Sequence, residues 1–93
     1  MPLETSPYDS AEFLKTKDQV VAYLEAAFED GDAPLISHAL GVVARSEGMS
    51  EVAKQAGLSR ASLYKALAEN GNPEFATVLK VVQALGLKLT IAA

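Results

Sequence analysis

The residues best suited to chemistry lie within residues 50–67, whose sequence is SEVAKQAGLSRASLYKAL. Arg60 can donate two hydrogen bonds to O6 and N7 of a guanine, and Lys65 follows between one and two helical turns later. The hydroxyl of Ser62 can bond to several bases, and the methyl group of Ala61 can contact the methyl group of a thymine. These residue types predict contact with the base edges of DNA.

A second set of polar residues precedes this group and suits phosphates rather than bases. Ser50, Lys54 and Gln55 lie where a preceding helix would meet the DNA backbone, and such contacts fix register but not sequence. There is no acid from residue 52 to residue 68, so the local charge favours a polyanion. The candidate DNA-binding residues are Ser50, Lys54, Gln55, Ser59, Arg60, Ala61, Ser62 and Lys65. The alternative is that the cations are ordinary solvated charges and Tyr64 is a half-buried packing residue.

Two short helices joined by a tight turn must position these side chains. Ala53 is small, as the first helix requires where the helices cross, and Gly57 tolerates the positive φ of the turn. The flanking inward positions are apolar, namely Val52, Ala56, Leu58, Leu63 and Ala66. This spacing predicts a helix-turn-helix with helices at 51–56 and 60–69, capped by Ser50 and Ser59. Any tight helix pair shares part of the pattern, so a protein-interaction module with the same fold is an alternative.

Three further helices are predicted around this pair. Thr16 begins a Thr-x-x-Gln capping box before the first of them. Asp32 offers the N-cap of the second helix, which Gly48 closes. Asn72 offers the N-cap of the last helix, and Gly86 is well placed just after its end.

The rest of the chain is predicted to form an arm and a strand. Residues 1–14 carry two prolines and little periodicity, so we expect an extended arm before a domain at 15–93. Residues 87–91 alternate apolar and polar side chains, which is typical of a short β-strand. A lone strand needs hydrogen-bond partners, so we expect it to pair with a second copy in a homodimer. The dimerisation residues would be Leu87, Leu89 and Ile91; the alternative is a tail that packs on the body.

Charge is distributed unevenly along the 93 residues, whose formal net charge is −4. Residues 1–32 hold eight acids against two lysines, a net of −6, whereas residues 33–93 hold six bases against four acids, a net of +2. Such asymmetry suggests two partners of opposite charge. The alternative is a solvated acidic face.

Composition and motifs exclude several classes of protein. The chain has no cysteine, which excludes disulfides, thiolate catalysis and cysteine zinc sites. We expect a cytoplasmic protein, because there is no signal-peptide pattern and the longest uncharged run has twelve residues, against about 20 for a membrane span. His38 is the only histidine, and no nucleophile-base pair, phosphate-cradling loop or metal-ligand cluster accompanies it. We therefore expect neither an enzyme nor a cofactor or metal.

Three segments carry a resemblance to a known family: YDSAEFL, VVAYLEAAFEDGD and GMSEVAKQAGLSRASLYKALAENGNPEFATVLKVVQALGLKL. Over residues 8–89 the chain resembles the probable addiction-module antidote proteins, which are HigA-like antitoxins with a lambda-repressor-like domain. The resemblance implies an antitoxin encoded beside a small basic toxin of the RelE/ParE fold and repressing its own operon. It also implies that six residues fall on DNA-contact positions: Ser50, Gln55, Ser59, Arg60, Ser62 and Lys65.

The expected fold is all-α: a five-helix lambda-repressor-like helix-turn-helix domain with an extended N-terminal arm and a short C-terminal β-strand. Tyr8, Phe13 and Leu14 would supply apolar anchors for the toxin, and Asp9 and Glu12 complementary charge. Alternatively, the three apolar residues close the chain's own core. A prophage-type repressor without a toxin is a further alternative. A dimer predicts a near-palindromic operator with half-sites about 34 Å apart, or a multiple of that spacing.

Overall fold

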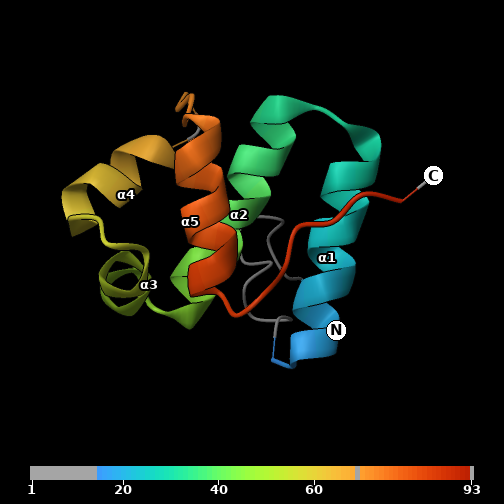
Figure 1. Cartoon of the computed structure of the whole chain (residues 1–93), viewed down its shortest axis with the longest axis horizontal. Coiled ribbons are helices and arrows are strands. Elements are labelled where there is room, and N and C mark those ends of the chain that lie inside the picture. Colours follow the sequence, from blue (N-terminus) through green and yellow to red (C-terminus); the bar gives the residue numbers. More distant parts are fainter. Residues whose placement is uncertain (1–14, 69, 93) are drawn as a thin grey trace, which may run out of the picture.

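The computed structural model describes residues 15–68 and 70–92. These residues form five helices, namely α1 (Lys17–Asp30), α2 (Ala33–Glu47), α3 (Met49–Ala56), α4 (Arg60–Ala66) and α5 (Phe75–Ala84). In Figure 1, α1 lies on one side of the molecule, α3 and α4 lie on the other, and α2 and α5 lie between them. The expected five-helix, all-α architecture is confirmed. None of the described helices is both long and apolar enough to cross a membrane.

The core is built from one face of each helix. Leu40 and Val43 of α2, Leu63 of α4 and Val81 of α5 are fully buried, and Leu24 of α1 is 5% exposed. Burying a side chain of this size stabilises the fold by roughly 1.5–3 kcal/mol. Because Leu63 anchors α4 from behind, the opposite face of this short helix is left to solvent.

The first two helices begin and end where local sequence signals predict. The backbone N–H of Gln19 donates to Thr16 Oγ1 at 3.1 Å, and the N–H of Thr16 donates to Gln19 Oε1 at 3.1 Å. This reciprocal pair is the predicted capping box of α1, which ends at Gly31 with a φ of 76°. Asp32 Oδ2 accepts a hydrogen bond from the N–H of Leu35 at 3.1 Å, which confirms the predicted cap of α2.

Two predicted N-caps are wrong. Helix α3 begins two residues earlier than predicted, so Ser50 lies inside it and Gly48, with a φ of 107°, stands at the N-cap. Helix α5 begins after Glu74, whose extended backbone (φ −65°, ψ 154°) makes it the N-cap in place of Asn72. An N-cap side chain bonds to the N–H two or three residues later, and because α5 begins only at Phe75, Asn72 stands two positions too early to cap it.

Helix α4 is also shorter than predicted, because it ends at Ala66 rather than at residue 69. Leu67 follows with a φ of −100° and a ψ of 11°, and its side chain is only 3% exposed. It packs on Gly41 of α2, where an added Cβ would lie 3.6 Å from Leu67 Cβ and 3.1 Å from its carbonyl oxygen. The helix therefore stops where the chain turns inward to bury Leu67 against α2.

The predicted C-terminal β-strand is wrong. Residues 87–92 contain no strand, and neither does any other part of residues 15–68 and 70–92. The segment instead lies along α1, where it lines a shared groove with Val21, Leu24 and Phe28 (Figure 1). The period-two spacing is present in the sequence, but a strand requires a ladder of backbone hydrogen bonds, and no extended partner lies among the described residues.

Candidate nucleic-acid interface

Gly57 makes the tight turn that the sequence predicts between α3 and α4. Its backbone lies in the left-handed region, with a φ of 73° and a ψ of 29°. The N–H of Leu58 donates to the carbonyl oxygen of Ala53 at 2.9 Å, which closes the turn. Ala53 is 3% exposed, so a small side chain occupies the buried side of α3 as expected. The prediction of a positive-φ glycine at this position is confirmed.

The N-terminal end of α4 projects into solvent. Its first three residues are exposed, whereas Leu63 directly after them is fully buried. The structure also leaves the candidate residues on α3 exposed. All eight sequence-predicted residues are solvent-exposed: Ser50, Lys54, Gln55, Ser59, Arg60, Ala61, Ser62 and Lys65. The α3–α4 face, as we call the surface formed by these eight residues, is therefore open to a ligand.

Ser59 serves mainly as the cap of α4. Its Oγ accepts a hydrogen bond from the N–H of Ser62 at 3.0 Å and donates one to Ser62 Oγ at 2.8 Å. The predicted cap is thus confirmed, and the single hydroxyl proton of Ser59 is already engaged. Ser62 keeps its own hydroxyl proton, so it is the better placed of the two serines to donate to a base or a phosphate.

Arg60 is held against its neighbour one helical turn later. Its Nη2 donates to the hydroxyl oxygen of Tyr64 at 3.3 Å, and its Cζ lies 5.3 Å from the centroid of the tyrosine ring. Tyr64 is 42% exposed. The sequence analysis did not assign this residue to the site, although the spacing of four residues on a helix was the signal that could have found it.

Carboxylates border the α3–α4 face. Gln55 Nε2 donates to Glu51 Oε2 at 2.9 Å, so the amide of this candidate residue is already bonded to an acid. Glu51 lies at the start of α3, just before the acid-free interval. Among the residues that the structure describes, the guanidinium of Arg60 bonds to Tyr64 and not to a carboxylate.

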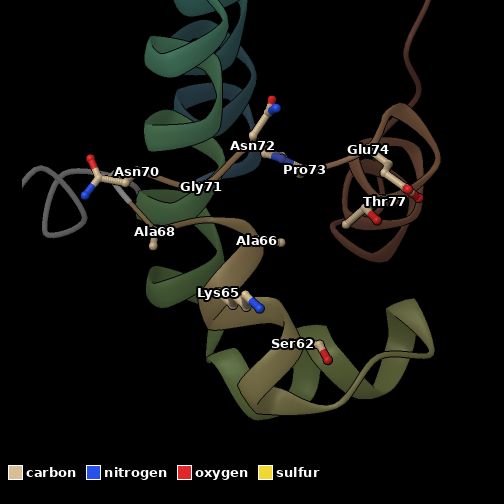
Figure 2. Close-up of a pocket in the computed structure, with 10 residues that line it drawn as sticks. All are labelled: Ser62, Lys65, Ala66, Ala68, Asn70, Gly71, Asn72, Pro73, Glu74 and Thr77. Carbon is tan, nitrogen blue, oxygen red and sulfur yellow. The ribbon is translucent and has the colours of Figure 1, made fainter.

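A hollow of about 670 Å³ lies between α4 and the start of α5. Figure 2 shows Ser62 and Lys65 on α4, with Glu74 and Thr77 across from them on the α5 side. The loop between the two helices completes the rim, and its residues Asn70, Gly71, Asn72 and Pro73 also line the hollow. Lys65 and the carboxylate of Glu74 therefore line opposite sides of the same hollow.

Gly71 fixes the position of this loop. An added Cβ would clash with the carbonyl oxygen of Ala66 and would lie 2.8 Å from that of Lys65. The N–H of Gly71 donates to the carbonyl oxygen of Ala68 at 2.7 Å. The loop backbone thus rests directly on the C-terminal end of α4, which only a glycine permits.

A second hollow, of about 590 Å³, lies on the other side of α4. It brings together Ser50 of α3 and Arg60 of α4, two of the predicted residues. Arg45 of α2 joins them, so the structure adds a cation that the sequence analysis did not assign. The other lining residues are Gly48, Met49, Glu51 and Tyr64.

The remaining predicted site residues lie elsewhere. Tyr8, Asp9, Glu12, Phe13 and Leu14, the candidates for toxin binding, lie outside the described residues. The three candidates for dimerisation lie in the C-terminal segment: Leu87 is half-buried against the core, Leu89 is 36% exposed and Ile91 is 99% exposed.

Fold and site together define a small all-helical domain that presents two short helices with exposed cations. A sequence model of the family described as "Probable addiction module antidote protein" matches residues 4–93. The chain therefore belongs to this family of antidote proteins. A Haemophilus influenzae protein described as "Uncharacterized protein" is 42% identical over 91 residues, which cover 98% of this chain and 94% of the relative. No solved structure matches the chain.

Proposed function

We propose that this antidote protein is an antitoxin that represses its own operon, in the cytoplasm, by binding DNA through the α3–α4 face. The observation that carries the proposal is the exposure of all eight candidate residues around the N-terminal end of α4. A helix N-terminus has free N–H groups and the positive end of the helix dipole, both of which attract phosphate. With α4 in the major groove, Arg60 would contact a guanine and Lys54 a phosphate.

The overall negative charge is compatible with this proposal because of where the acids lie. Glu25 and Glu29 are exposed on α1, and Asp30 and Asp32 are exposed where α1 meets α2. Figure 1 shows α1 on the opposite side of the molecule from α3 and α4. Repulsion between these carboxylates and a bound DNA is weakened because exposed charges more than about 8–10 Å apart are largely screened at physiological salt.

Fluorescence anisotropy with a labelled duplex from upstream of the gene for this chain tests the DNA part of the proposal. We expect binding that weakens steeply as salt rises. Arg60→Ala should cost about 1–3 kcal/mol of binding free energy and relax preference at one base pair, whereas Lys54→Ala should weaken all sequences alike and lower the salt slope by about 1. Lys88→Ala is the matched control, because it removes the same charge from the α1 side of the molecule. A duplex of scrambled sequence that binds as tightly as the upstream duplex would contradict specific repression.

The proposal further includes a homodimer on a near-palindromic operator, with Leu89 and Ile91 in the contact. Support comes from the exposure of these two apolar side chains in the same short segment. Analytical ultracentrifugation of Ile91→Lys should show a monomer at concentrations where the wild type is a dimer. Thr90→Lys adds the same charge to the neighbouring exposed residue and is the control. A wild type that stays monomeric both alone and on DNA would refute this part.

The toxin is proposed to be a small basic protein of the RelE/ParE fold that contacts the acidic N-terminal third. Support comes from family membership together with the net charge of −6 on residues 1–32. Co-expression with the product of the adjacent gene should give a co-purifying complex. Deletion of residues 1–14 should weaken this complex if Tyr8, Phe13 and Leu14 are anchors. Undiminished binding after the deletion would show that the arm does not contribute to toxin binding.

One observation favours a second candidate, a protein-interaction module that does not bind DNA. Glu51 engages Gln55 on α3, and Glu74 lines the same hollow as Lys65. Both carboxylates would repel phosphates that approach the α3–α4 face. The salt series separates the two candidates, because an interaction module would show no salt-dependent binding to the upstream duplex.

A further inference from the structure

We infer that Tyr64 is a positioning residue that holds the Arg60 guanidinium in one orientation for bidentate recognition of a guanine. The inference rests on the proposed binding of DNA by the α3–α4 face. It assigns to Tyr64 a role in specificity that neither family membership nor the turn geometry supplies.

The contact restrains Arg60 in two ways. The hydrogen bond of 3.3 Å from Nη2 to the Tyr64 hydroxyl fixes the end of the side chain, and the ring lies 5.3 Å from Cζ, within the range of a cation–π contact. An unrestrained arginine carries about 2 kcal/mol of rotamer entropy, which a DNA contact would have to remove. The contact with Tyr64 would supply part of this ordering before DNA binds.

Tyr64 is itself held by its helix. It follows Leu63, which is fully buried, and α4 begins at the cap that Ser59 forms with Ser62. The backbone at Tyr64 is thus held within α4, and the residue is 42% exposed. Because its backbone is held in this way, Tyr64 can limit the orientations that the Arg60 side chain adopts.

The contact leaves Arg60 able to read a base. A guanidinium has five N–H donors, and the bond to Tyr64 uses one of them. Four donors remain, and a guanine requires two, for O6 and N7. Among the described residues, no carboxylate is bonded to these donors, although Glu51 lines the same hollow as Arg60. Tyr64 therefore orients the Arg60 guanidinium and leaves enough of its N–H donors free to bond to a guanine.

Removing the ring should weaken operator binding through Arg60 alone. Immobilising one flexible side chain at an interface corresponds to about a 2- to 10-fold change in affinity. We expect Tyr64→Leu to weaken binding to the upstream duplex by about this factor, and Tyr64→Phe, which keeps the ring and loses the hydroxyl, by less. Tyr64→Leu should also reduce discrimination at the one base pair that Arg60 contacts. Tyr23→Phe, which removes the same hydroxyl from α1, should change neither quantity.

A double-mutant cycle makes the test specific. Tyr64→Leu should have no further effect on affinity in the Arg60→Ala background, because the residue that it positions is then absent. In the free protein, ¹⁵N relaxation of the Arg60 Nε–Hε group should show greater mobility in Tyr64→Leu than in the wild type. The exposed position of Tyr64 predicts that this variant folds, which circular dichroism checks, and Tyr64→Phe gives a second, milder variant.

Three results would overturn the inference while leaving DNA binding in place. The first is an unchanged affinity of Tyr64→Leu for the upstream duplex. The second is a tighter affinity of this variant, which would mean that the contact between Tyr64 and Arg60 must break on binding. The third is a loss of affinity from Tyr64→Leu that is equally large in the Arg60→Ala background. A wild-type chain that does not bind the upstream duplex at all would instead overturn the proposed function, and the inference with it.

Discussion

Gly71→Ala tests whether the loop after α4 rests on the helix end as described. The new Cβ would lie 2.8 Å from the carbonyl oxygen of Lys65 and closer still to that of Ala66. These are backbone atoms at the end of a helix, so they cannot turn away as a side chain would. Relieving the contact with Lys65 out to 3.4 Å, where ordinary contact begins, requires a shift of about 0.6 Å, the difference between 3.4 and 2.8 Å, and the contact with Ala66 requires a larger one.

The expected cost of this shift is about 1–3 kcal/mol of unfolding free energy, the range for overpacking that forces the backbone to move. At a glycine without such a contact, substitution by alanine would raise the unfolding free energy, by about 0.4–1 kcal/mol where the backbone permits it. For a chain of this size the loss corresponds to a fall of about 5–20 °C in Tm. The sign of the change alone therefore distinguishes the two cases.

Thermal and urea denaturation followed by far-UV circular dichroism measure the effect. Asn72→Ala is the matched control, because it alters the next residue of the same loop, which is exposed, and should stay within about 0.5 kcal/mol of wild type. A Gly71→Ala variant that melts at or above the wild-type temperature would refute the described packing of the loop on α4. The outline of the hollow that contains Lys65 would then be wrong as well.

Three further predictions concern stability and are measured by urea denaturation. Thr16→Ala should cost about 0.5–2 kcal/mol, because it removes the hydroxyl that caps α1, and Thr16→Ser should restore most of the loss. Gly57→Ala should cost about 1–2 kcal/mol at its φ of 73°, and Gly57→Asn less; equal stability of wild type and alanine variant would contradict the turn. Leu63→Ala should cost about 2–5 kcal/mol, since Leu63 is fully buried; a smaller loss would mean that α4 is not anchored from behind.

Local signals in the sequence predicted those parts of the fold that depend on a few neighbouring residues. The caps at Thr16, Asp32 and Ser59 and the positive φ of Gly57 are of this kind, and all four are confirmed. The cap predicted at Asn72 is wrong because α5 begins at Phe75, two residues later than Pro73, where the sequence predicted its start.

The features that the sequence did not predict depend on contacts between segments. Alternation at residues 87–91 spaces side chains as a strand would, yet it carries no information about a backbone partner. The early end of α4 follows from the burial of Leu67 against α2, which no local pattern reveals. The exposure of the eight candidate residues agrees with the sequence analysis, whereas the inclusion of Arg45 in the hollow beside Arg60 required the packing of α2.

The close approach of α2 to the residue after α4 links the buried position Gly41 to the α3–α4 face. At Gly41 the backbone of α2 lies so close to Leu67 that only a glycine fits without a shift of its neighbours. A methyl group there would lie 3.1 Å from the carbonyl oxygen of Leu67 and 3.2 Å from Arg45 Nη1. A larger residue at Gly41 would push the backbone at Leu67, directly after α4, by a few tenths of an ångström and would leave every exposed side chain of α4 unaltered. A substitution at this interior position would therefore act on the proposed interface from inside the domain, without changing any residue that the interface exposes.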